Sequence, residues 1–146
     1  MGIKDQHQLA LALDAMPNTL SEFLIEETVV EVIAEVLVGV RRDPPVGWLI
    51  TLGAGGIYTE LWQDTQFLLA PTTESQIHQA LKKLRIAPLL TGFRGKPPAN
   101  LNALVDLVQS VVKLAMNNNL VEIELNPVLV TPNTAVAVDA LVIVEQ

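Results

Sequence analysis

The C-terminal segment restricts the fold of this chain most, because it predicts a β-hairpin whose register can be worked out. Two stretches rich in β-branched residues, "LVEIELNPVLV" and "AVAVDALVIV", are joined by "TPNT", which signals a turn although it lacks the usual glycine. If Pro132 and Asn133 form a two-residue turn, residues whose numbers sum to 265 face each other. Asn126 then stands opposite Asp139, with Cβ atoms roughly 4.5 to 5.5 Å apart.

The same hairpin places further acidic side chains beside this pair. Because strand side chains alternate with a period of two, Glu122 and Glu124 share the face of Asn126. Three carboxylates and an amide oxygen on one face need either solvent or a cation, and Mg²⁺ prefers such hard oxygen ligands. The pattern alone leaves two alternatives open, which are a magnesium site and a solvated acidic face.

The rest of the chain alternates between strand-like and helix-like patterns. Together they predict an α+β fold with a mostly antiparallel sheet and two main helices, in a single domain that spans residues 1–146. Strands are expected from "SEFLIEE", "EVIAEVLVGV", "GWLITLG", "IYTELWQ" and "QFLLA". Helices are expected over residues 4–16, over 73–85 after a capping-box signature, and over 100–117.

Composition excludes several classes of function. The chain has no cysteine, which rules out disulfides, thiolate catalysis and zinc-thiolate sites and fits a cytoplasmic protein. Its net charge of -7 makes nucleic acid an unexpected partner. No run approaches the roughly 20 apolar residues of a membrane helix, so no membrane association is expected.

Two other features could belong to a binding site but also have an ordinary structural explanation. Glu26 and Glu27 end a predicted strand and fit a hinge that offers backbone groups to a base, with Glu35 within the next strand. Charged residues on strand edges also protect ordinarily against aggregation, and the pattern favours that interpretation. The "GAGG" run at residues 53–56 could approach an anion, but it lacks the P-loop lysine, and a glycine-rich hairpin is the favoured explanation.

Four long stretches resemble the C-terminal lobe of the ATP-grasp module in ADP-forming acetyl-CoA and acyl-CoA synthetases, and more distantly the β subunit of succinyl-CoA synthetase. The resemblance implies that Glu27 and Val30 lie at the adenine, that Glu35 lies near the ribose or phosphates, and that Asn126 and Asp139 bind magnesium. ATP or ADP and Mg²⁺ are therefore the expected cofactors. The stretches are "LIEETVVEVIAEVLVGVRRDPPVGW", "LGAGGIYTELWQD", "LLTGFRGKPPANLNALVDLV" and "VEIELNPVLVTPNTAVAVDALV".

The resemblance also implies an activity and the partners it requires. Members of this family couple acyl-CoA cleavage to ATP synthesis, or the reverse, through an acyl phosphate and a phosphohistidine. No stretch of this chain matches the N-terminal ATP-grasp lobe or the CoA-binding and phosphohistidine domains, so these are expected partners and the isolated chain is expected to be inactive. Relatives also occur as regulatory modules fused to acetyltransferases, and a regulatory module linked to protein-lysine acetyltransferase is the alternative function.

Three arginines and a set of large apolar residues complete the expectations. Arg41, Arg42 and Arg94 fall in the matched stretches and are candidates for cationic contacts to phosphate. An exposed apolar patch, or a homo-oligomer that covers it, is expected from Trp48, Leu61, Trp62 and Phe93.

Overall fold

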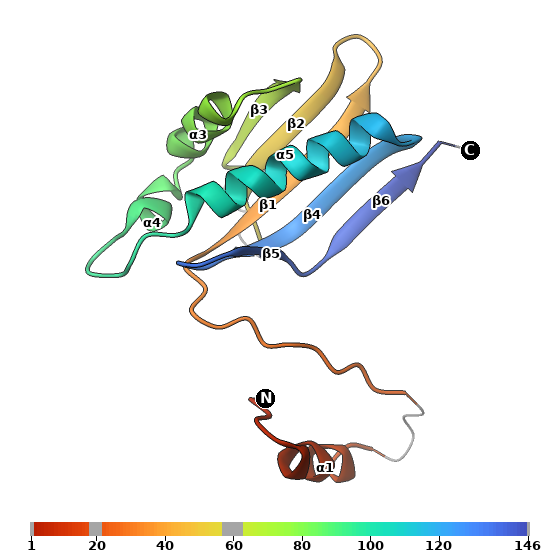
Figure 1. Ribbon diagram of the computed structural model, residues 1–146, viewed down its shortest axis with the longest axis vertical. Helices are drawn as coiled ribbons and strands as arrows, with labels where there is room; N and C mark the ends of the chain where they lie inside the picture. Colours follow the sequence, from red (N-terminus) through yellow and green to blue (C-terminus); the bar gives the residue numbers. More distant parts are fainter. Residues whose placement is uncertain (1, 18–21, 57–62, 146) are drawn as a thin grey trace. The chain divides into compact units, whose positions relative to one another are not determined.

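The computed structural model of the chain describes residues 2–17, 22–56 and 63–145, in two compact units, Met1–Val30 and Glu31–Gln146 (Figure 1). The first unit holds helix α1 (Gln6–Asp14), and the second holds the remaining elements. In chain order these are β1 (Ala34–Asp43), β2 (Gly47–Ala54), β3 (Thr65–Ala70), α3 (Glu74–Lys83), α4 (Ala87–Thr91), α5 (Leu101–Asn117), β4 (Leu120–Val130), β5 (Ala135–Ala137) and β6 (Ala140–Val144).

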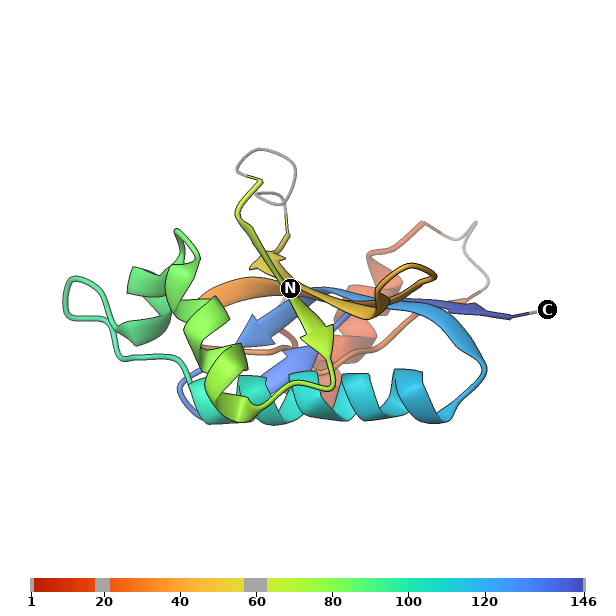
Figure 2. The same ribbon diagram turned by 90° about the horizontal axis from the view of Figure 1, so that it is seen from above.

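The second unit is built on an antiparallel sheet. Its strand order is β3-β2-β1-β4-β5, and β6 pairs with β4 beyond the end of β5. All the strand pairs found among the described residues are antiparallel. Helices α3 and α5 pack on this sheet, and Figure 2 shows α5 running along one side of it. The predicted α+β architecture with two main helices is confirmed.

The core lies between the sheet and the helix layer, and strand periodicity decides which residues reach it. Alternate residues of β1 and β2 face the helices, among them Val36, Val38 and Ile50, which are fully buried. Leu104 and Ile77 meet them from α5 and α3. The opposite side of the sheet, called the open face below, therefore carries the residues in between.

Helices α1, α3 and α5 begin at residues whose side chains cap them. Asp5 accepts a hydrogen bond from the Gln8 amide at the start of α1. Thr73 and Gln76 form the predicted capping box of α3. Asn100 accepts from the Ala103 amide at the start of α5. Each side chain satisfies backbone N–H groups that have no partner inside the helix.

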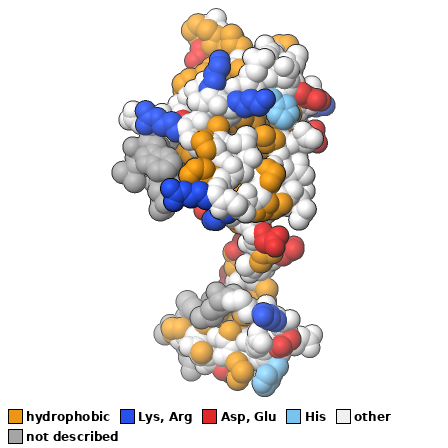
Figure 3. All heavy atoms as spheres, turned by 90° about the vertical axis from the view of Figure 1, so that its left-hand side faces the viewer, with side chains coloured by type: hydrophobic (Ala, Val, Ile, Leu, Met, Phe, Trp, Pro, Cys, Tyr) orange, Lys and Arg blue, Asp and Glu red, His pale blue; other side chains and the backbone are white. Residues whose placement is uncertain are grey.

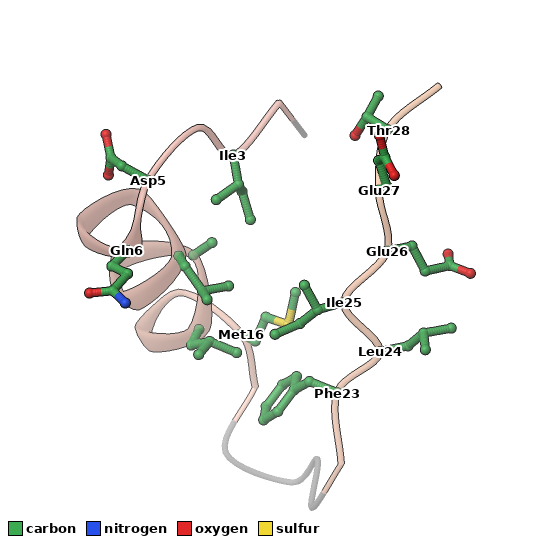
Figure 4. A pocket seen from close by; sticks show the side chains of 13 residues that line it. Ile3, Asp5, Gln6, Met16, Phe23, Leu24, Ile25, Glu26, Glu27 and Thr28 are labelled. Atoms are coloured by element: carbon green, nitrogen blue, oxygen red, sulfur yellow. The ribbon is translucent and has the colours of Figure 1, made fainter. Parts of the chain in front are cut away.

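The first unit departs from the sequence prediction. The expected strand over 21–27 is wrong, because its described residues are extended but belong to no strand. A strand is completed only by a hydrogen-bonded neighbour, and no described strand pairs with this segment. In Figure 4, Phe23 and Ile25 point toward α1 across a cleft of about 620 Å³, whereas Leu24 and Glu26 point away.

The predicted apolar patch is only partly tested. Trp48 packs against the core instead of joining an exposed patch. Phe93 is 45% exposed, as expected. Leu61, Trp62 and most of the predicted strand "IYTELWQ" lie outside the described residues. Across the described ranges, no helix has the length and apolar character needed to cross a membrane.

Candidate nucleotide and metal site

The register predicted for the C-terminal hairpin is confirmed. Val128 pairs with Ala137, and Leu125 pairs with Ala140, so facing residues sum to 265 on both sides of Asn126. The Asn126 backbone N–H donates to the Asp139 carbonyl oxygen at 3.3 Å. Asn126 and Asp139 are therefore cross-strand neighbours.

A bulge in β4 at this point is a feature that the sequence analysis missed. Ile123 and Leu125 are buried before it, and Val128 and Val130 are buried after it, so the buried face changes from odd to even numbers. The pairing of β1 with β4 shifts register between Val36 and Val38 at the same place. Asn126 and Pro127 lie at this bulge, and bulges commonly redirect side chains next to functional sites.

The other carboxylates predicted beside the pair lie along the strand and do not gather into a cluster. Glu122 and Glu124 help to line a shallow cleft of about 350 Å³ on the open face. Across the part of the chain that the structure describes, no three or more His, Cys, Asp or Glu side chains are placed to hold a metal ion. Glu122, Glu124 and Asp139 therefore do not form a three-carboxylate cluster. Asn126 and Asp139 remain the candidate metal pair.

The glycine run joins Glu35 to the hairpin. The Gly55 N–H donates to the backbone carbonyl of Glu35 at 2.9 Å, and the Gly56 N–H donates to Asn126 Oδ1 at 3.0 Å. A Cβ atom added at Gly56 would overlap the Glu35 carboxylate, so that carboxylate lies directly against Gly56. Glu35 and Asn126, which are 91 positions apart in the sequence, thus meet on either side of residue 56.

Both glycines are required by the geometry of this contact. A Cβ at Gly55 would stand 2.7 Å from the Val36 backbone, closer than packing allows. Gly56 has φ of +62°, which favours a residue without a Cβ atom. An ordinary glycine-rich hairpin was expected for this run, and the structure adds a close approach of its backbone to the side chains of Glu35 and Asn126.

The donor set at this end of the open face consists of oxygen atoms. Asp139 is exposed, and its Oδ1 accepts from the Ala140 N–H at 2.8 Å, which leaves Oδ2 for a ligand. Asn126 is half-buried, and its Oδ1 keeps one lone pair beyond the bond from Gly56. Carboxylate and amide oxygens are ligands that Mg²⁺ prefers.

The two remaining predicted site residues belong to the first unit. They are Glu27 and Val30, and both are exposed in an extended segment. Glu35, Asn126 and Asp139 all belong to the second unit. Of the three arginines, Arg42 forms a hydrogen bond with Glu145 at 3.0 Å, and Arg41 lies 3.6 Å from Asp43.

The comparisons with known proteins bear on this site. The family model described as "ATP-grasp domain" matches residues 2–144. The chain is 37% identical over 110 residues to the acetate–CoA ligase (ADP-forming) I subunit beta of Pyrococcus furiosus, covering 75% of this chain and 47% of that subunit. It is 34% identical over 125 residues to the acetate–CoA ligase (ADP-forming) I of Archaeoglobus fulgidus, covering 85% of this chain and 18% of that protein.

A solved structure also resembles the chain. The acetyl-coenzyme A synthetase 1 of Ca. Korarchaeum cryptofilum, in complex with coenzyme A and Mg-AMPPCP, superposes with a TM-score of 0.73 at 34% identity. The match covers 77% of this chain and 53% of that one. In that structure a phosphohistidine segment points towards the nucleotide binding site. The chain thus spans about half the length of the β subunit and of this solved chain.

Proposed function

The chain belongs to the ATP-grasp domain family, and from this premise we propose that it is the nucleotide- and magnesium-binding lobe of an ADP-forming acyl-CoA synthetase. The observation that carries the proposal is that Gly56 lies against the Glu35 carboxylate and donates to Asn126, whose cross-strand neighbour is Asp139. The ADP-forming ligases among the relatives support this choice of reaction.

Asn126 and Asp139 are the residues to which we assign the metal ion. They are cross-strand neighbours, their ligand atoms are hard oxygens, and each keeps acceptor capacity beyond its hydrogen bond in the chain. When held by these two residues, Mg²⁺ would neutralise the charge that develops on the transferred phosphoryl group. The metal in the Korarchaeum complex supports this assignment.

ATP or ADP is the proposed nucleotide, and three residues of this chain would contact it. Glu35 would face the ribose or phosphates, since its carboxylate lies against Gly56 beside the metal pair. Glu27 and Val30 would contact the adenine from the extended segment of the first unit. Val30 is 68% exposed, which leaves its side chain free to cover an apolar base.

The complete reaction requires parts that this chain does not supply. The proposed reaction converts a carboxylic acid, CoA and ATP into acyl-CoA, ADP and phosphate through an acyl phosphate and a phosphohistidine. An N-terminal ATP-grasp lobe would close over the nucleotide, and CoA-binding and phosphohistidine domains would complete the cycle. The chain alone is therefore proposed to be inactive.

A ligase assay of the complete protein tests the proposal. The protein that carries this chain, together with any separately encoded subunits, should form acyl-CoA from an acid, CoA and ATP with release of ADP. Asp139→Asn should lower turnover by about 100-fold or more, the scale seen when one transition-state-stabilising group is lost. Asp106→Asn is the matched control, because Asp106 is exposed on α5 and should leave turnover unchanged.

The alternative function predicts another result in the same assay. A regulatory module linked to protein-lysine acetyltransferase would show no ligase activity in the complete protein, whether Asp139 is intact or replaced. That outcome would overturn the ligase proposal.

A further inference from the structure

Positive charge is concentrated in one part of this acidic chain. Residues 75–105 contain five of the nine Lys and Arg residues and none of the sixteen Asp and Glu residues. Every Lys, Arg, Asp or Glu in this segment is thus a cation, although the whole chain has a net charge of -7, so charge is distributed very unevenly along the sequence. The proposed nucleotide site uses none of its five cations.

The five cations lie on consecutive elements and are all exposed. Two end α3, one lies between α3 and α4, and two lie in the loop after α4. We call this set the basic face, and its members are Lys82, Lys83, Arg85, Arg94 and Lys96. Figure 3, which views the side of the molecule where α3 and α4 lie, shows Lys and Arg side chains gathered around apolar ones.

No acidic side chain within the described residues neutralises the basic face. The ion pairs found there are Arg41 with Asp43 and Arg42 with Glu145, and neither involves this set. Attraction to the C-terminal end of the α3 dipole accounts at most for Lys82 and Lys83, in the last turn of that helix. Arg94 lies beyond α4 with its guanidinium 5.3 Å from the Phe93 ring, which is itself half-exposed.

Helix α4 connects the basic face to the proposed site. Arg85 precedes this helix, and Arg94 and Lys96 follow it. Ile86, which immediately precedes α4, and Leu89 within it line a cleft of about 410 Å³. Apolar residues from the start of β1 and the end of β2 line the cleft further, and Glu35 lies at the same cleft.

We propose that the basic face docks the phosphohistidine-bearing segment of the partner phosphohistidine domain when that segment visits the nucleotide site. This inference rests on the proposed function. A phosphorylated histidine carries roughly two negative charges, as other protein phosphates do near neutral pH. The carboxylates of Glu35 and Asp139 repel such a group, and an adjacent cationic surface offsets the repulsion and speeds encounter.

Binding of a phosphorylated peptide to the whole 146-residue chain tests the docking surface. The probe is a peptide with the sequence of the phosphohistidine segment of the Korarchaeum synthetase, prepared with a stable phosphohistidine analogue and in unphosphorylated form. We expect the phosphorylated peptide to bind at least tenfold more tightly than the unphosphorylated one. Its affinity should fall as salt is raised, because exposed charges are screened.

Paired substitutions locate the binding surface. The double variant Arg94→Ala with Lys96→Ala should weaken binding of the phosphorylated peptide at least fivefold. The control double variant Lys4→Gln with Lys113→Gln removes the same charge elsewhere and should change the affinity less than twofold. Circular dichroism of both variants should match that of the unmodified chain.

Three outcomes would overturn the proposal. They are equal binding by the two double variants, equal binding of the phosphorylated and unphosphorylated peptides, and no binding of the phosphorylated peptide at millimolar concentration. Peptide binding does not depend on turnover, so its result is independent of the ligase assay. If any of these three outcomes occurs while the complete protein is an active ligase, only the docking surface is refuted. If the complete protein has no ligase activity, the proposed function itself is refuted.

Discussion

Replacing Gly56 with alanine separates the stability of the fold from the geometry of the proposed site. Gly56 has φ of +62°, and a Cβ there would overlap the Glu35 carboxylate. The backbone conformation costs an alanine about 1 to 2 kcal/mol. The overlap adds little to this cost, because the Glu35 carboxylate is the end of an exposed, flexible side chain that can swing away.

The effect on the site should be larger than the effect on stability. With the Glu35 carboxylate displaced from its place beside Asn126, turnover of the complete enzyme should fall at least about tenfold, which corresponds to about 1.4 kcal/mol of lost transition-state stabilisation. Gly47→Ala is the matched control, since Gly47 has φ of +92° at the start of β2 and a Cβ there meets nothing within 4 Å.

Urea unfolding of the chain and a ligase assay of the complete enzyme measure the two effects. Both alanine variants should lose similar amounts of unfolding free energy, and only Gly56→Ala should lose turnover. Equal turnover of the two variants would refute the placement of Glu35 in the site. A loss several kcal/mol larger for Gly56→Ala would refute the inference that the side chain simply moves.

Two further predictions concern the scaffold that holds the site. Asp64 is buried, and its carboxylate accepts hydrogen bonds from the backbone N–H groups of Arg85 at 2.8 Å and Ile86 at 3.1 Å. Asp64→Ala should therefore lower the free energy of unfolding in urea by about 2 to 4 kcal/mol. Asp64→Asn keeps one acceptor oxygen and should lower it by less. Equal costs would contradict this role. Leu104 is fully buried on α5 and Leu114 is 53% exposed on the same helix. Leu104→Ala should therefore lower the unfolding free energy by about 2 to 5 kcal/mol, and Leu114→Ala by under about 0.5 kcal/mol. A large loss at Leu114 would show that the exposed helix face is packed.

The parts of the fold that sequence predicted well are those with local rules. Capping side chains and periodic apolar residues placed α3 and α5, because both signals act within one helix. The register of β4 with β5 and β6 followed from a two-residue turn and a period of two. The cross-strand placement of Asn126 and Asp139 needed nothing more.

The parts that sequence missed depend on contacts between distant segments. The β4 bulge at Asn126 is visible only in pairing with β1, and the contact of Gly56 with Glu35 and Asn126 joins three separate strands or loops. Residues 22–27 have a strand-like composition, but a strand also requires a neighbour, which composition does not report. The roles of Glu27, Val30, Glu35, Asn126 and Asp139 come from family resemblance and stay predictions.

The central claim is that this chain supplies one side of a nucleotide site, and calorimetric titration of the isolated chain with Mg-ATP tests it most directly. In the proposed site, Glu35, Asn126 and Asp139 would contact the nucleotide from one lobe only. The triphosphate would then keep most of its water, and Mg²⁺ gives up its hydration reluctantly. The account predicts a Kd no tighter than about 1 mM, equivalent to about -4 kcal/mol, and no ATP hydrolysis. Micromolar affinity or measurable hydrolysis by the isolated chain would contradict it.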